Sequence, residues 1–260
     1  MISDSALLLF AVCILGGLGL LAWSLLSRAR RNLLAGIEEA ALADLGFGRT
    51  VGVSGVADAP APLASPVSNT PCVFYEKQVD VQHTLSPEPG DAGDALAMGL
   101  TMAGKLGWVG ESVDHAGGFF LMDGGAKAFV FPRGAKLRIA GEHQNSVQDP
   151  GVDVTRRITE RFIPQGRTVC VIGRPHRLDE AFAAIQRDIG LPPETLKKLG
   201  EAGPIPCFFD DGAGTFIVAD MAFPDLRADA AESADSLFWA GLAMLGMGVF
   251  LVIAFVFRLI

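Results

Sequence analysis

The chain has 260 residues, half of them hydrophobic, and a formal net charge of -8 at pH 7. This charge argues against a nucleic-acid partner, because phosphate binding needs a basic face and the only basic cluster is Arg28, Arg30 and Arg31. The four cysteines are far apart and form no C-x-x-C pair, which argues against a disulfide framework and favours buried, reduced thiols.

Apolar segments near both ends of the chain predict transmembrane helices. Residues 6–26 and 237–257 contain no charged side chain, and at 1.5 Å per residue each is long enough to cross a hydrocarbon core of about 30 Å. The first segment lacks the basic start and small-residue cleavage site of a secretory signal, so we expect an uncleaved anchor. Several glycines in the two segments would allow the helices to approach closely: Gly16, Gly17, Gly19, Gly241, Gly246 and Gly248.

Two spans would place both termini on one side of the membrane and the intervening domain on the other. Arg28, Arg30 and Arg31 adjoin the domain, and Lys and Arg residues favour the cytoplasmic side. We therefore expect an integral protein of the cell membrane whose soluble domain faces the cytoplasm. Membrane lipids are the expected partners, and each arginine near anionic headgroups would contribute about 1 kcal/mol.

Between the spans, the patterns predict an α+β fold in which a β-rich domain carries a small helical insertion. Residues 28–46 have helical apolar spacing up to Gly46 and predict a stalk helix. Residues 47–235 contain β-branched and aromatic runs typical of roughly nine strands. Two hairpins are predicted around "MDGGAK" and "FDDGAG", and helices are predicted over about 177–200.

Residues 86–118 fit this pattern least well. "SPEPGDAGD" indicates a loop, and "ALAMGLTMAGKLGWVG" is apolar but too short to cross a bilayer. We favour an ordinary insertion that packs on the domain over an interfacial docking segment that uses Lys105 and Trp108.

No motif for catalysis, a cofactor or a metal is found. The four histidines never share a helical face, and no Walker loop, H-E-x-x-H or G-x-S-x-G sequence occurs. Cys72 follows a proline and enters an apolar strand, which favours a buried small hydrophobe over a nucleophile. Asp210 and Asp211 fall at a predicted turn, where aspartate is favoured for its geometry alone. No catalytic, cofactor-binding or metal residues are therefore predicted, and whether the chain is an enzyme stays open.

Three stretches in chain order resemble one family: "GVSGVADAPAPLASPVSNTPCVFYEKQV", "GGFFLMDGGAKAFVFPRGAKLRI" and "RRITERFIPQGRTVCVIGRP". They are similar to the GIDE domain, the membrane-adjacent domain of the mitochondrial ubiquitin ligase MULAN and its prokaryotic relatives. The features that match are Pro71-Cys72-Val73 before Tyr75, Asp123-Gly124 after a Phe-rich run, and Glu160 ahead of Gly166 and Gly173.

The family resemblance implies a RING-type ubiquitin-protein transferase, but we expect this chain to lack that activity. A RING holds two zinc ions with about eight closely spaced Cys and His ligands, and no such cluster follows residue 257 or occurs elsewhere. We therefore expect a prokaryotic two-pass membrane protein that presents a GIDE-type domain and binds a protein partner as a scaffold or sensor. One alternative is ligase function with a RING from another chain. The other is a membrane-bound hydrolase that uses residues such as Cys72, His83 or Asp123.

Overall fold

The computed structural model describes residues 4–83, 109–139, 142–148, 154–179, 181, 193–201, 205–212 and 214–256. It divides into two compact units, Met1–Glu38 with Phe223–Ile260, and Glu39–Ala222. We call the first the helix pair and the second the β unit. Most of the segment 86–118 and most of the helix expected from residue 177 lie outside the described residues.

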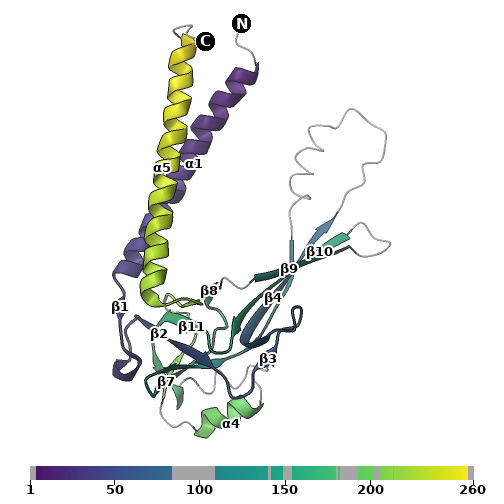
Figure 1. Ribbon diagram of the computed structural model, residues 1–260, viewed down its shortest axis with the longest axis vertical. Helices are drawn as coiled ribbons and strands as arrows, with labels where there is room; N and C mark the ends of the chain where they lie inside the picture. The colour runs from purple at the N-terminus through teal and green to yellow at the C-terminus, as the bar shows by residue number, and fades with distance from the viewer. Residues whose placement is uncertain are drawn as a thin grey trace. The chain divides into compact units, whose positions relative to one another are not determined.

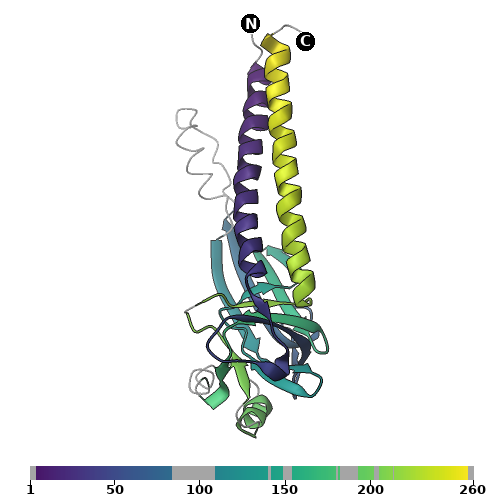
Figure 2. The same cartoon turned by 90° about the vertical axis from the view of Figure 1, so that its left-hand side faces the viewer.

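The helix pair consists of α1 (Asp4–Ala35) and α5 (Phe223–Val256), which run antiparallel and side by side in Figures 1 and 2. Both are rich in leucine and alanine, residues that lose little side-chain freedom in a helix. Arg227 on α5 donates hydrogen bonds to the backbone oxygens of Leu34 and Ile37. It thereby adds a donor to carbonyls at and just beyond the carboxyl end of α1, where the hydrogen bonding of the helix stops.

The prediction of two membrane spans flanking an α+β domain is wrong. Within the described residues one helix, over Phe223–Ile253 of α5, is long and apolar enough to cross a membrane. Helix α1 also contains apolar residues, but its last turns carry Arg28, Arg30 and Arg31. The fold is mostly β-sheet, in two sheets, with one N-terminal helix and one apolar C-terminal helix.

The helix at the start of the chain is also shorter than its apolar spacing suggested. It ends at Ala35, whereas a stalk helix was expected to continue to residue 46. Gly36 follows directly, and glycine is an unfavourable residue for continuing a helix. The chain then forms a two-residue strand and the short 3-10 helix η1 (Leu42–Asp44).

The β unit contains a nine-stranded and a five-stranded sheet (Figure 1). The larger sheet has the order β12-β13-β7-β6-β2-β11-β14-β8, with β1 beside β2. Its strands are β1 (Glu38–Glu39), β2 (Val51–Asp58), β6 (Phe119–Asp123), β7 (Ala126–Val130), β8 (Lys136–Arg138), β11 (Thr168–Gly173), β12 (His176–Arg177), β13 (Pro206–Phe208) and β14 (Ile217–Ala219). The smaller sheet joins β3 (Leu63–Ala64), β4 (Pro71–His83), β5 (Val109–Gly117), β9 (Glu142–Gln148) and β10 (Val154–Pro164). One described helix, α4 (Pro193–Glu201), accompanies them.

One of the two predicted hairpins is confirmed and the other is wrong. β6 and β7 pair antiparallel across Gly124 and Gly125, whose positive φ angles of 53° and 96° suit a tight type I′ turn. The strands on either side of "DDGAG", β13 and β14, do not pair with each other. β13 pairs parallel with β7, and β14 pairs with β11 and β8. The edges of β13 and β14 are therefore occupied by strands that are distant in sequence.

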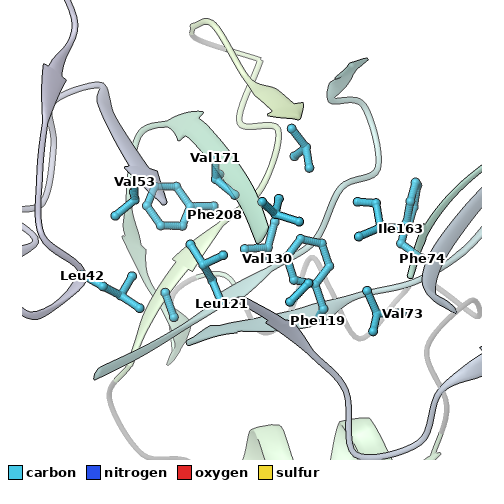
Figure 3. Close-up of a cluster of buried hydrophobic side chains, with 14 of the residues drawn as sticks. Leu42, Val53, Val73, Phe74, Phe119, Leu121, Val130, Ile163, Val171 and Phe208 are labelled. Atoms are coloured by element: carbon cyan, nitrogen blue, oxygen red, sulfur yellow. The ribbon is translucent and has the colours of Figure 1, made fainter. Parts of the chain in front are cut away.

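The core of the β unit lies where apolar residues of both sheets meet (Figure 3). Phe119 and Leu121 of β6 and Val130 of β7 are fully buried, and Phe74 of β4 and Ile163 of β10 extend the same cluster. Burying one such side chain contributes about 1.5–3 kcal/mol relative to leaving it in water. The long strands β4 and β10 are thus anchored in this core at one end.

Replacing Gly117 with alanine should destabilise the β unit severely. Gly117 has a φ of 103°, and an added Cβ would collide with the backbone oxygen of Val73. Backbone strain and the clash together should cost roughly 3–5 kcal/mol, measured as a shift in the urea unfolding of the full chain in detergent. Gly166 also has a positive φ, 78°, but open space around it, so Gly166→Ala isolates the strain and should cost about 1–2 kcal/mol. Equal effects of the two substitutions would contradict this account.

Candidate functional site

Glycines bring the two helices of the helix pair into close contact. An added Cβ at Gly17 would lie 2.7 Å from Cγ of Leu245, and one at Gly241 would lie 3.2 Å from the backbone oxygen of Gly17. Side chains at these positions would therefore force the backbones apart. Small residues at such crossings are typical of helices that associate by van der Waals packing.

The outer surface of α5 is apolar and exposed. Only 11% of its most apolar stretch is buried inside the structure, whereas the core helix of a soluble protein would be mostly buried. Seven large apolar side chains are exposed along it: Trp239, Leu242, Met247, Val249, Phe250, Val252 and Ile253. An exposed apolar surface of this extent is typical of contact with a lipid or protein partner.

Two exposed tryptophans, one on each helix, lie near one end of the apolar stretch of α5. Leu21 lies against Gly241, so the antiparallel register places Trp23 at the level of Trp239. Both indoles are about two-thirds exposed. Tryptophan is enriched where a membrane meets water, because its ring is apolar while its N–H is polar. These two residues therefore mark a candidate membrane–water boundary on the helix pair.

Glu160 on β10 is a fully buried carboxylate of the β unit. It accepts hydrogen bonds from the backbone N–H groups of Val67 at 2.8 Å and Ser68 at 3.0 Å, in the loop between β3 and β4. The loop is closed by a 2.6 Å hydrogen bond between the hydroxyls of Ser65 and Ser68 and by one from Thr70 N–H to Ser65 Oγ. Glu160 thus fixes the loop conformation from a distant strand.

The environment of Glu160 favours its ionised form. Burial alone would raise the pKa of this carboxyl, but the hydrogen bonds from Ser68, Val67 and Ser65 outweigh it and hold the pKa below its usual value of 4.5. All of these donors belong to the loop between β3 and β4, and the carboxylate accepts from them. The arrangement therefore serves to order the chain and is unsuited to general acid or base catalysis near neutral pH.

Replacing Glu160 with glutamine should destabilise the chain at neutral pH by about 1–3 kcal/mol, because the amide would turn an N–H toward the donors of the loop. Since the folded pKa of Glu160 is lowered, its contribution is present above pH 4.5 and is lost as the pH falls through that folded pKa. The penalty for Glu160→Gln should therefore shrink in acid. Urea unfolding of the full chain in detergent at several pH values measures it.

Glu76 is the matched control for this substitution, because it is partly exposed and lies 3.5 Å from Arg161 in a surface ion pair. Glu76→Gln should change stability by less than about 1 kcal/mol. A Glu160→Gln penalty that stays constant down to acid pH would refute the role assigned to its charge.

The three residues considered for a hydrolase are not brought together. Cys72 and His83 lie at opposite ends of β4, about 35 Å apart at the usual rise of a strand. Asp123 ends β6 in the larger sheet. Burial and, secondarily, the charge of Glu160 raise the pKa of Cys72 to about 11. Its thiol is therefore protonated at neutral pH and a poor nucleophile.

A maleimide should not label the folded chain rapidly at neutral pH, because all four cysteines are buried. Denaturant should make all four thiols react, which mass spectrometry can count. Fast native labelling that Cys72→Ser abolishes would instead indicate a reactive thiol at this position.

A pair that the sequence patterns did not reveal is formed by His176 and Asp211. His176 Nε2 lies 3.1 Å from Asp211 Oδ2, and Arg174 Nη1 lies 3.5 Å from the same oxygen. The two partners are 35 residues apart, so no local motif connects them. Asp210 beside them does have the expected turn role, since its carboxylate accepts from Gly212 N–H at 3.0 Å.

Cys207 pairs with His176 in the strand register, but burial raises the pKa of its thiol and no hydrogen bond from it to the imidazole is present. Within the described residues no three metal-ligating side chains come together. The His176–Asp211 pair thus links β12 to the segment after β13 and offers no assembled catalytic or metal site there.

A comparison of the chain with protein families, curated proteins and solved structures finds no match. The likeness to the GIDE domain therefore depends on the quoted residues alone. Glu160 from the third of these stretches holds the loop that precedes Cys72 in the first.

Proposed function

We propose that this protein is a non-catalytic, membrane-anchored binding module. Helix α5 enters the cell membrane, and the β unit is a GIDE-type domain that binds a protein partner as a scaffold or sensor. The observation that carries the proposal is the exposed apolar surface of α5, which has the length and composition to cross a bilayer.

The basic residues of α1 support a cytoplasmic position for the β unit. Arg28 and Arg31 follow Trp23 in the direction of the chain that leads to the β unit. Lys and Arg close to a membrane boundary favour the cytoplasmic side. Membrane lipids are therefore one partner of the helix pair, and a protein is the proposed partner of the β unit.

The non-catalytic role is supported by the way the buried polar groups of the β unit are used. Glu160 is saturated by loop donors, and Asp80 is held by Arg157 at 2.8 Å and by Gln78 at 2.8 Å. The hydrogen bonds from Arg157 are the main reason that the pKa of Asp80 is lowered. These carboxylates are engaged in folding, which leaves binding as the function best supported.

The zinc content of the purified chain distinguishes a non-catalytic binding module from a RING-type ubiquitin ligase. A RING binds two zinc ions per domain. Metal analysis of the purified full chain should find less than one zinc per chain, and two would favour the ligase alternative.

The full chain should remain in the membrane fraction after alkaline carbonate and should float with phospholipid vesicles. Replacing Met247 and Phe250, both outward-facing on α5, by arginine should shift the chain to the soluble or aggregated fraction. Each arginine within the apolar stretch costs about 2.5–3.5 kcal/mol of insertion.

Glu232→Arg is the control, since Glu232 is exposed on the polar part of α5 and its replacement adds the same side chain. It should leave flotation unchanged. A wild-type chain that carbonate washes from the membrane would disprove the anchoring role of α5.

A further inference from the structure

Arg28 on α1 contacts an aromatic ring of α5. Its guanidinium lies over the ring of Phe238 on α5, with Cζ 4.2 Å from the ring centroid. This cation–π contact fixes the direction of a long, otherwise flexible side chain. It holds the positive charge against α5 at the end of the apolar stretch.

Two other arginines of the helix pair have oxygen partners. Arg31 lies 3.3 Å from the carboxylate of Asp235, and Arg227 donates to the backbone oxygens of Leu34 and Ile37. For Arg28, Nε is buried and has no hydrogen-bond partner within the described structure. An aromatic ring offers a guanidinium charge stabilisation but no oxygen acceptor, so the N–H groups of Nη1 and Nη2, rather than the buried Nε–H, are left for an external anion.

The position of Arg28 along the helix pair matches the depth of lipid phosphates. Trp23 and Trp239 lie at one level, and the guanidinium of Arg28 lies over Phe238, the residue next to Trp239, although the backbone of Arg28 follows that of Trp23 by about 7.5 Å along α1. Tryptophan side chains prefer the headgroup boundary, so a basic residue just beyond them lies among phosphate groups. Exposed Leu25 and Leu26 adjoin it and could contact the acyl chains of the same lipid.

We propose that Arg28 binds the phosphate of an anionic phospholipid headgroup. The ring of Phe238 packs against one face of the guanidinium. The planar guanidinium presents two N–H groups that match two phosphate oxygens. The site selects a lipid over a free anion because it combines one positive charge with an adjoining apolar surface. This inference rests on the proposed membrane anchoring of α5.

The test uses the full chain reconstituted in vesicles of phosphatidylcholine that contain traces of spin-labelled phosphatidylglycerol or spin-labelled phosphatidylcholine. Electron paramagnetic resonance measures the relative association of each labelled lipid with the protein. Wild type should prefer the anionic lipid by about fivefold, the effect expected of one arginine near the surface. Arg28→Gln should abolish the preference, and Arg28→Lys, which keeps the charge without the fork, should retain part of it.

A double variant, Arg31→Gln with Asp235→Asn, is the matched control, because it removes the neighbouring ion pair without changing the net charge. It should keep the full preference, and inorganic phosphate in the buffer should not compete with the lipid. Circular dichroism and flotation confirm that each variant is folded and inserted.

The outcomes separate this inference from the proposed function. Failure of wild type to enter vesicles overturns both. Insertion with equal affinity for the two lipids, an undiminished preference in Arg28→Gln, or competition by free phosphate overturns the lipid site and leaves the anchoring role intact.

Discussion

The exposed apolar side chains of α5 are the constraint on which the rest of the protein depends. Removing apolar surface from water contributes about 25 cal/mol per Å², and α1 covers only part of α5. Gly17 and Gly241 let the backbones approach, so the two helices can pack without a hydrophobic force between them. The outward faces still require a non-aqueous environment. A lipid bilayer meets this requirement along the whole apolar stretch, which a small protein partner would cover only in part.

The β unit meets a different constraint, which is to stabilise long strands that carry many polar residues. One end of each of β4 and β10 lies in the apolar core, and farther along the two strands ion pairs join them, including Arg157 with Asp80 and Arg161 with Glu76. Arg157 on β10 holds Asp80 on β4 at 2.8 Å, and Asp80 is buried. A buried ion pair repays its desolvation only with good geometry and further hydrogen bonds, which Gln78 supplies here. The charged groups of this sheet thus stabilise its fold.

Elements that depend on neighbouring residues could be predicted from the sequence, and elements that depend on residues far apart in the sequence could not. The turn at Asp123, Gly124 and Gly125 was predictable because positive φ angles at two glycines specify a hairpin within a few residues. The similar composition around Asp210 led to a hairpin prediction that is wrong, because β13 pairs with β7 and β14 pairs with β11, both far away in sequence. The same distance hid the His176–Asp211 pair. Hydropathy predicted two membrane spans, whereas within the described residues one helix, in α5, is long and apolar enough to cross a membrane.

The contrast between Arg28 and Arg31 shows what only the pairing of helices can determine. The two residues are three positions apart on α1, so they lie on nearly the same face and look equivalent in the sequence. The antiparallel register places Asp235 opposite one and Phe238 opposite the other. Arg31 is therefore paired with a carboxylate within the protein, while the guanidinium of Arg28 is oriented by an aromatic ring. A shift of α1 by three residues against α5 would bring Asp235 opposite Arg28 or Phe238 opposite Arg31, so the close packing at Gly17 and Gly241 also decides which of the two arginines meets the carboxylate.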